Sequence, residues 1–590
     1  MNIQTSVGEI AVTGEFGTAW KLEHTKTELE PGLELVHLHL HLETEGELPP
    51  PQFSLHWFIP LVDIQTRWAP MVNYNRYLPP NWSCETKSNL ASSAPIMAFL
   101  NQKGQNRFTM AISEAIREVK IYGGVHEERC DVECRAELFT APEAPLHSYD
   151  VTLRFDTRGI FYADAIRAVS DWFAAMPAYK PSPAPAAAFE PIYSSWYSYH
   201  QEVFDKELEA ECALAKEFGM KGIIVDDGWQ TDDNKRGYAF CGDWEISRRR
   251  FPDMPAHVAK IHELGMKYVV WFSVPFVGEH SKAYERFKGK YLYESKGLNT
   301  AVLDPRFPEV REYLINIYEN AMREWGIDGF KLDFIDTMRF DGEDPAVAEN
   351  YAGRDIKCLP EAVDLLLSDT MHRLRAIKPD VLIEFRQSYI GPAIRKYGNM
   401  FRASDCPADV LSNRLRTLDL RLTTGTTAVH SDMLEWNCAE SAEVAALQLL
   451  NVLFSVPQIS VKLEVIPEEH RRMLRFWLNF CIEHRDVLLH GYLKPYHPEL
   501  NYPIVSSETA KEKVIAVYNY GQIVKVACDA GKPCHIVNAT ERSELYLDLA
   551  AAPASAEAFD ALGRPAPVGE LKAGCMKVAI PRAGLLTLKF

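Results

Sequence analysis

Lys331 and Asp333 are the residues of this sequence whose type and spacing suggest chemistry most directly. They close the segment 325–334, which reads Trp-Gly-Ile-Asp-Gly-Phe-Lys-Leu-Asp-Phe. The apolar residues before them are typical of a buried strand, and side chains two apart on a strand point to the same face. A cation beside a carboxyl group keeps that group ionised. An ionised carboxylate held at a strand end can attack a sugar as a nucleophile; the alternative is an ion pair that only stabilises the strand end.

Strand-like and helix-like segments alternate through the middle of the chain and predict the frame that would hold this pair. The expected strands span 191–199, 222–225, 268–272, the stretch up to Asp333, 381–385, 400–403, 426–430 and 458–461. The expected helices span 205–219, 251–265, 308–325, 359–377, 412–422, a segment from 441, and 468–482. About eight strand–helix units in residues 189–488 favour a (β/α)8 TIM barrel over an open doubly wound sheet. The absence of a Gly-x-Gly-x-x-Gly turn after the first strand also argues against a dinucleotide-binding fold.

The segments on either side of this alternation are expected to be β-rich. Residues 34–43 alternate polar and apolar side chains, so residues 1–180 are predicted to form an N-terminal β-sandwich with a linking helix. A Pro- and Ala-rich stretch at 180–188 marks the boundary with the barrel. Residues 489–590 return to strand patterns and predict a small C-terminal β-sandwich.

Length and composition narrow the class of protein. A chain of 590 residues is expected to hold several domains, and its net charge of −18 argues against a nucleic-acid partner. The sequence predicts neither a secretory signal nor a membrane segment, which needs about 18 apolar residues in a row. Its 12 cysteines include no Cys-x-x-Cys pair, so we expect free thiols in a reducing compartment and a cytoplasmic protein. Whether the chain forms a homo-oligomer is left open.

Polar and aromatic residues recur at the ends of the expected strands. They are Trp196, Tyr197, Asp226, Asp227, Trp271, Glu384, Arg386, Arg402, Asp405, His430 and Asp432. The carboxyl ends of barrel strands meet at one face, so these side chains are expected to form one polar pocket with several carboxylates. Paired carboxylates in such a pocket indicate chemistry on glycosidic bonds.

Several of these motifs resemble those of a known family. Val-Asp-Asp-Gly-Trp at 225–229, Lys-Leu-Asp at 331–333 and Arg-Ala-Ser-Asp at 402–405 are similar to signatures of clan D glycoside hydrolases, specifically the family 36 α-galactosidases. Ser-Trp-Tyr at 195–197 and the segment 303–313 also fit. The plan of sandwich, barrel and C-terminal β domain extends the resemblance over essentially the whole chain. It implies a retaining exo-acting α-galactosidase that acts on a carbohydrate substrate and needs neither a metal nor an organic cofactor.

The resemblance also implies a role for each matched residue. Asp333 would be the nucleophile and Asp405 the general acid and then base, while Arg402 and Lys331 would bind the sugar. Asp226 and Asp227 would grip its far hydroxyls, although a helix N-cap and a strand end are the structural alternative. The residues at wall positions are Trp196, Tyr197, Trp229 and Trp271, any of which could instead be ordinary core. Because Asp405 must start protonated, it is expected in a less cationic or more desolvated setting than Asp333.

The sequence departs from the family at two turns. Residues 271–276 read Trp-Phe-Ser-Val-Pro-Phe, without the glutamates of the family's Trp-Phe-Glu-Pro-Glu. Residues 384–391 read Glu-Phe-Arg-Gln-Ser-Tyr-Ile-Gly, where the family carries a turn rich in Cys and Gly near the sugar 2-position. Arg386 and Gln387 would suit an anionic or otherwise modified sugar. An ion pair of Arg386 with Glu384 or an aspartate is the alternative.

Two further residues are candidates with open roles. His430 could bind substrate, orient Asp432, or be a satisfied histidine at the barrel mouth. Trp82 lies in an aromatic-rich stretch of the first domain and is a candidate lid over the pocket, with core packing as the alternative. Three functions therefore remain in play: α-galactosidase, α-glycosidase or transglycosylase for another glycone, and a catalytically silent sugar-binding barrel.

Overall fold

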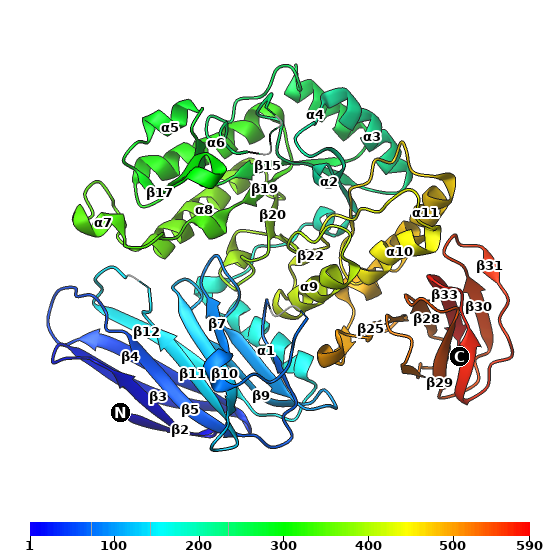
Figure 1. Cartoon of the computed structure of the whole chain (residues 1–590), viewed down its shortest axis with the longest axis horizontal. Helices are drawn as coiled ribbons and strands as arrows, with labels where there is room; N and C mark the ends of the chain where they lie inside the picture. The colour runs from blue at the N-terminus through cyan, green and yellow to red at the C-terminus, as the bar shows by residue number, and fades with distance from the viewer. Residues whose placement is uncertain (72–73, 142, 234, 236) are drawn as a thin grey trace.

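The structure is a computed structural model that describes residues 1–71, 74–141, 143–233, 235 and 237–590. Three regions follow one another along the chain: a blue two-sheet region, a green and yellow barrel, and a red β region at the C-terminal end (Figure 1). The expected architecture of a central TIM barrel between two β domains is confirmed. Among the described residues, no helix is both long and apolar enough to cross a membrane.

The first region consists of two antiparallel sheets that pack face to face. Their strand orders are β1-β2-β5-β11-β10-β7 and β3-β4-β12-β9-β8-β6. The strands are β1 (Asn2–Thr5), β2 (Gly8–Gly14), β3 (Trp20–Glu30), β4 (Leu33–Leu42), β5 (Phe53–Pro60), β6 (Thr66–Trp68), β7 (Glu85–Ser88), β8 (Ile96–Leu100), β9 (Asn106–Ile112), β10 (Val119–His126), β11 (Asp131–Leu138) and β12 (Ser148–Asp156). Alternating residues of both sheets, such as Leu38, Leu40, Leu55 and Trp57, fill the core between them. The short helix η1 (Asn81–Ser83) precedes β7.

Eight parallel strands form the barrel, in the order β22-β21-β20-β19-β15-β14-β13-β23. The strands are β13 (Ile192–Ser194), β14 (Gly222–Val225), β15 (Lys267–Ser273), β19 (Gly329–Asp333), β20 (Leu382–Arg386), β21 (Met400–Arg402), β22 (Ala428–His430) and β23 (Gln458–Ile459). Parallel bridges from His430 to Val456 and from Leu434 to Ile459 close the sheet on itself. All the carboxyl ends therefore open on the same side.

Helices surround the barrel, and most lie where the sequence predicts them. They are α3 (Asp205–Glu217), α4 (Met254–Glu263), α6 (Pro308–Trp325), α8 (Leu359–Ile377), α9 (Val410–Thr423), α10 (Ala442–Asn451) and α11 (Glu468–Glu483). The shorter elements are α5 (Lys282–Arg286), α7 (Pro345–Ala348), η4 (Lys296–Leu298), η5 (Ile335–Thr337), η6 (Ile394–Lys396) and the π-helical η7 (Asp486–His490). α6 and α8 each carry proline at the start of the helix, where its missing N–H costs nothing.

The structure differs from the sequence-based expectation at two places in the barrel. The predicted strand 191–199 ends at Ser194 and is followed by one helical turn, α2 (Trp196–Tyr199), because the backbone N–H groups of Tyr197 and Ser198 donate to Ser460 Oγ at 3.1 and 3.2 Å. A small sheet that the sequence did not predict follows β15. Its strands, in the order β16-β18-β17, are β16 (Phe276–Gly278), β17 (Tyr291–Ser295) and β18 (Thr300–Leu303).

The C-terminal region also has two sheets, with strand orders β24-β25-β26-β28-β33-β30-β31 and β27-β29-β32. The strands are β24 (Lys494–Tyr496), β25 (Ile504–Glu508), β26 (Lys513–Val517), β27 (Ile523–Val526), β28 (Pro533–Asn538), β29 (Glu544–Leu549), β30 (Ser555–Phe559), β31 (Pro565–Ala566), β32 (Gly574–Ala579) and β33 (Gly584–Lys589). The helix η8 (Pro498–Leu500) joins β24 to β25.

One buried carboxylate on α9 ties the three regions together. Asp419 pairs with Arg76 of the first region at 2.5 Å and accepts a hydrogen bond from Trp68 Nε1 at 3.1 Å. The hydroxyl of Tyr502, from the C-terminal region, donates to the same carboxylate at 2.7 Å. The linking helix α1 (Tyr162–Ala174) packs on β8, β9 and α9. The first region is therefore anchored to the helix that follows the loop carrying Asp405.

Candidate active site

A cavity of about 150 Å³ opens at the carboxyl ends of the barrel strands. It is lined by Trp196, Asp226, Asp227, Tyr238, Trp271, Lys331, Asp333, Phe334, Arg386, Arg402, Ser404 and Asp405. The volume suits one sugar ring rather than a chain of them. The strand ends bring these residues together because β14, β15, β19, β20 and β21 are neighbours in the barrel.

Asp333 is the most firmly held carboxylate of the cavity. Arg386 Nε donates to its Oδ1 at 2.7 Å, and the hydroxyl of Tyr389 lies 3.2 Å from the same oxygen. The indole N–H of Trp271 donates to Oδ2 at 3.1 Å. Burial by itself would raise the pKa of Asp333, but the positive charges of Arg386 and Lys331 outweigh burial and hold the pKa well below its usual range. Asp333 is therefore ionised and fixed in orientation.

Lys331 projects beside Asp333 but forms its direct ion pair with another residue. Its Nζ lies 2.5 Å from Oδ2 of Asp226, and both side chains are almost fully buried. Lys331 still lowers the pKa of Asp333 through space, although Arg386 contributes more. The pair of Lys331 and Asp333 inferred from the strand spacing thus has a third member, Asp226, which directly follows β14.

Asp227, next to Asp226, is bound by two amide side chains. Gln201 Nε2 donates to Oδ2 at 2.5 Å, and Gln230 Nε2 donates to Oδ1 at 2.6 Å. Burial raises the pKa of Asp227 to about 6, against the lowering effect of the two glutamine amides. Its charge therefore changes in a pH range where many enzymes are assayed.

Asp405 lies in a different setting from the one expected. Arg402 Nη1 is 2.9 Å from Asp405 Oδ1, and the Asp405 side chain keeps 54% of its surface exposed. Partial burial raises the pKa of Asp405, but Arg402 and Lys331 lower it more, so the net direction is down. Residues three apart on this turn place a guanidinium directly against the carboxylate. Asp405 is still less cationic in its surroundings than Asp333, which also faces Arg386, but it is more exposed and not more desolvated.

Arg402 is shared among several carboxylates, which weakens its hold on any one. It also pairs with the buried Asp432 and lies 3.5 Å from Glu384. Burial raises the pKa of both Asp432 and Glu384, although Arg402 opposes the shift. Three carboxyl groups thus compete for one guanidinium, and the two buried ones are the easier to protonate.

The remaining residues singled out in the sequence divide into those inside the cavity and those behind it. Trp196 and Trp271 line it. Trp229 is fully buried and donates its indole N–H to the carbonyl of Trp271 at 2.9 Å, and Tyr197 donates its hydroxyl to Asp432 at 2.8 Å. The Gln387 amide oxygen accepts from the backbone N–H of Ser404 at 3.0 Å. These residues therefore position the cavity wall.

His430 and Trp82 lie away from the cavity. His430 is fully buried, with Nε2 on the carbonyl oxygen of Ala188 at 2.8 Å and Nδ1 near Gln458 at 3.2 Å, so it packs inside the barrel below the mouth. Trp82 on η1 is 77% exposed and lines neither cavity described in this section. We therefore leave both out of the proposed site.

Four residues of the site were missed from the sequence. Tyr238, Phe334 and Ser404 line the cavity, and Tyr389 contacts Asp333. Phe334 and Ser404 are immediate neighbours of predicted site residues, so their positions at strand ends were the available signal. Tyr238 lies in the long loop between β14 and α4, where no periodic pattern exists to place it.

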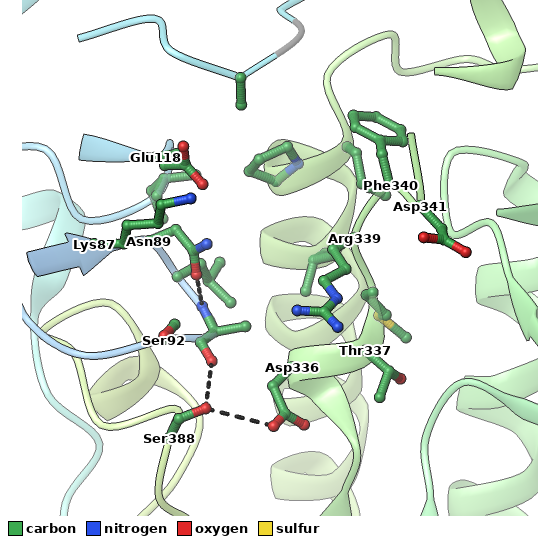
Figure 2. A pocket seen from close by; sticks show the side chains of 18 of the residues that line it. Lys87, Asn89, Ser92, Glu118, Asp336, Thr337, Arg339, Phe340, Asp341 and Ser388 are labelled. Carbon is green, nitrogen blue, oxygen red and sulfur yellow. Dashed lines mark hydrogen bonds between the residues drawn. The ribbon is translucent and has the colours of Figure 1, made fainter. Parts of the chain in front are cut away.

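A larger cavity of about 530 Å³ lies between the first region and the barrel (Figure 2). Lys87, Asn89, Ser92 and Glu118 face it from one side, and the segment 336–342 after β19 faces it from the other. Ser388 Oγ donates to Asp336 Oδ2 at 3.4 Å, and Arg386 Nη2 lies 3.4 Å from Asp336 Oδ1. Arg386 thus stands between the two cavities, with one edge on Asp333 and the other on Asp336.

The barrel strands carry a family match that agrees with this geometry. Residues 187–392 match the Melibiase family, a span that includes Asp226, Lys331, Asp333 and Arg386 and ends before Arg402. This part of the barrel, from β13 to β20, is similar to the Melibiase family. The resemblance noted in the sequence motifs is thereby confirmed.

Curated relatives align with this chain over limited stretches. Alpha-galactosidase AgaA of Geobacillus stearothermophilus is 27% identical over 150 residues, which are 24% of this chain and 20% of AgaA. The bifunctional alpha-galactosidase/sucrose kinase AgaSK of Mediterraneibacter gnavus is 28% identical over 207 residues, which are 33% of this chain and 20% of AgaSK. The aligned stretches thus span about a fifth of the length of each relative.

Structural similarity extends over nearly the whole chain. A crystal structure of a GH36 alpha-galactosidase AgaA variant from Geobacillus stearothermophilus, in complex with 1-deoxygalactonojirimycin, superposes with a TM-score of 0.66. The superposition covers 98% of this chain and 83% of that chain at 13% sequence identity. The two proteins therefore share their fold, including the domains on either side of the barrel.

Proposed function

We propose that this protein is a retaining exo-α-glycosidase that hydrolyses terminal α-galactosides. The observation that carries the proposal is the convergence of Asp333 and Asp405 on one cavity of about 150 Å³ with Asp226, Asp227 and Lys331. The family of the barrel and the names of its relatives support galactose as the sugar. The size of the cavity supports release of one terminal sugar at a time.

In this mechanism Asp333 attacks the anomeric carbon and forms a covalent glycosyl-enzyme, while Asp405 gives its proton to the departing oxygen. Asp405 then takes a proton from water, which hydrolyses the intermediate. Trp271 and Tyr389 hold the two oxygens of Asp333, so the nucleophile is oriented before substrate arrives. Asp226 and Asp227 offer acceptors for sugar hydroxyls at the far end of the cavity.

The proton that Asp405 must donate has a source in the cluster around Arg402. In the free protein the exposed Asp405 takes the negative charge, and the buried Asp432 and Glu384 are the groups more easily protonated. A bound sugar would cover Asp405, remove water from it and raise its pKa. Asp432 and Glu384, which Arg402 already contacts, would then be ionised and would balance the positive charge of Arg402.

The larger cavity is the proposed place for the rest of the substrate. It is next to the sugar cavity across Arg386 and Asp336, and it has both apolar walls, such as Leu90 and Phe340, and hydrogen-bonding groups, such as Asn89. Sugar chains present the same mixture of apolar faces and hydroxyls. The first region would therefore contribute to substrate binding through this cavity.

The test is a panel of aryl α-glycosides followed by chemical rescue. Turnover of p-nitrophenyl α-galactoside above other glycones would support the proposal, and a lack of turnover with every glycone would leave a silent sugar-binding barrel. The variant Asp333→Gly in the presence of azide should yield β-galactosyl azide, because azide enters on the face the nucleophile occupied. Formation of the α-azide by this variant would contradict the assigned nucleophile.

A second candidate function keeps the mechanism but changes the sugar. Arg386 brings a guanidinium to the cavity wall, and a carboxylate on the glycone could pair with it by displacing Asp336, which lies 3.4 Å from Nη2. Higher kcat/KM for an aryl α-galacturonide than for the galactoside would favour this function. Transfer of the sugar to an added alcohol in preference to water would instead favour a transglycosylase.

The compartment is part of the proposal as well. All 12 cysteines of the sequence are described and free. Free thiols persist in reducing compartments, which supports a cytoplasmic enzyme.

A further inference from the structure

Two histidines and a glutamate meet where the barrel joins the C-terminal region. His484 is the residue that caps the end of α11, Glu512 precedes β26, and His535 lies in β28. One side-chain nitrogen or oxygen of each residue lies within 4.8 Å of those of the other two. The three residues are separated by 28 and 23 positions in the sequence, which matches no short motif. Only the fold brings them together.

The contacts within the cluster leave one ring nitrogen unused. His484 Nδ1 hydrogen bonds to Glu512 Oε2 at 2.6 Å, and His535 Nδ1 is 3.0 Å from the hydroxyl of Thr587. His535 Nε2 is buried and has no hydrogen-bond partner among the residues that the structure describes. It faces the same Glu512 Oε2 at 3.4 Å.

This arrangement has the features of a metal site. With Nδ1 donating to Thr587, the lone pair of His535 Nε2 points at a carboxylate oxygen, and a cation between the two would satisfy both. Histidine ligands of metals usually donate their other nitrogen to a protein oxygen, as His535 does to Thr587. Two imidazoles and one carboxylate are a common zinc ligand set, which leaves a further position for water.

The two separations that involve Glu512 need little adjustment to hold an ion. Ligand atoms around a tetrahedral zinc with bonds of about 2.0–2.1 Å lie roughly 3.3 Å apart. The separation of His535 Nε2 and Glu512 Oε2, 3.4 Å, already matches. His484 must withdraw by less than 1 Å from its hydrogen bond to Glu512, and its side chain, 19% exposed, has room to move and leaves a path for entry.

We propose that His484, Glu512 and His535 bind a divalent transition-metal ion of the zinc class that fastens the C-terminal β region to the last barrel helix. The ion would be structural, because the cluster shares no residue with either cavity near Asp333. It would stabilise the joint between the two regions and leave the chemistry of the barrel unchanged.

The test uses the full-length protein, stripped with EDTA and dialysed against Zn²⁺ or Co²⁺. One equivalent of metal per chain and a visible absorption band of tetrahedral Co²⁺ are expected. The variants Glu512→Gln and His535→Asn should lose this equivalent, while His490→Asn, a nearby histidine outside the cluster, should keep it. Zn²⁺ should also raise the Tm of the wild type but not of Glu512→Gln.

Two results would overturn the proposal. One is a stripped wild-type protein that binds less than about a tenth of an equivalent, which would leave the cluster as a hydrogen-bonded His–Glu pair. The other is equal binding by wild type and Glu512→Gln, which would place the metal elsewhere. Because Glu512→Gln keeps size and hydrogen bonding, circular dichroism can show that it folds before the comparison is made.

Discussion

Asp333 and Asp405 line the same cavity, yet the protein holds them in opposite ways. Asp333 is buried at the end of β19, and groups from β15, β20 and the turn after β20 fix both of its oxygens. Asp405 stands on a loop after β21, half exposed, with Arg402 as its ion-pair partner. The difference fits a nucleophile that must stay charged and an acid–base group that must change charge during each cycle.

The comparison also shows where this protein departs from the resemblance. On the Asp226 and Lys331 side both residues match the family motifs, although the turn after β15, which lies between their strands, lacks the family's glutamates. On the β20 side Arg386 pairs directly with Asp333, the proposed nucleophile, where the resemblance leads us to expect small residues. The altered turn therefore affects the pKa of Asp333 as well as the shape of the pocket.

The largest expected effect is the loss of activity when the Asp333 carboxylate is removed. Asp333→Ala should lower kcat toward p-nitrophenyl α-galactoside by at least about 10³-fold, because no other group forms the covalent intermediate. Initial rates of the purified variant measure this. Asp341→Ala, an exposed aspartate at the larger cavity, is the control and should stay within about twofold of wild type. Near-normal turnover by Asp333→Ala would remove the assigned nucleophile.

The second prediction concerns Asp405 and depends on the leaving group. Asp405→Ala should lower kcat/KM for methyl α-galactoside by about 10²–10⁴-fold, the usual contribution of a general acid. The loss should be much smaller for a p-nitrophenyl leaving group, which departs without a proton. Azide should restore turnover and give the α-azide, the opposite product from Asp333→Gly. Equal losses for both substrates would rule out the acid role.

The third prediction tests how Arg386 acts on Asp333. Arg386→Gln removes the closest positive charge, so the pKa of Asp333 should rise and the acidic limb of kcat against pH, which Asp227 affects little, should move up by about 1–2 pH units. Arg373→Gln, on the outer surface of α8, is the matched control and should leave the limb in place. An unmoved limb in Arg386→Gln would mean that Lys331 alone sets the charge of Asp333.

Much of this site could be predicted from strand ends, and the limits have physical causes. In a parallel barrel the carboxyl ends converge, so Asp226, Asp333 and Arg402 had to be neighbours once the strands were placed. Which cation pairs with which carboxylate depends on side-chain conformations, and so the pairing of Lys331 with Asp226 was not foreseen. Arg402 and Asp405 are three residues apart, and this spacing was the one signal in the sequence for their close contact.

Residues far apart in the sequence were the hardest to place. Tyr238 comes from an irregular loop, and the larger cavity arises only where the first region meets the barrel. Neither leaves a periodic pattern, because loops and domain contacts follow no fixed spacing. The strand 191–199 was overextended for a related reason: Ser460 is far away in the sequence but follows β23, the neighbour of β13, and it stabilises the helical turn that ends the strand.

The fourth prediction concerns Asp227, which in the proposed mechanism accepts hydrogen bonds from the sugar in its ionised form. Its pKa is raised to about 6, so KM should rise as the pH falls through 6, by about tenfold per pH unit below that value, while kcat changes less. Burial disfavours the charged form, so Asp227→Asn should also be at least as stable as wild type at pH 7 and should lose the KM dependence. A KM that stays constant from pH 7 to pH 4.5 would show that Asp227 does not contact the substrate.

The smallest expected effect tests whether the first region takes part in binding. Ala91 lines the larger cavity and is only half-buried, so Ala91→Trp should fill part of the space. KM should rise about three- to tenfold for a galactosyl oligosaccharide such as raffinose, which corresponds to roughly 0.7–1.4 kcal/mol. KM for p-nitrophenyl α-galactoside should change by less than twofold, because its small leaving group stays near Asp405. Ala91→Ser adds a hydroxyl without filling the cavity and should resemble wild type on both substrates. Equal increases for the two substrates would indicate a distorted barrel mouth, and no increase for either would confine binding to the cavity around Asp333.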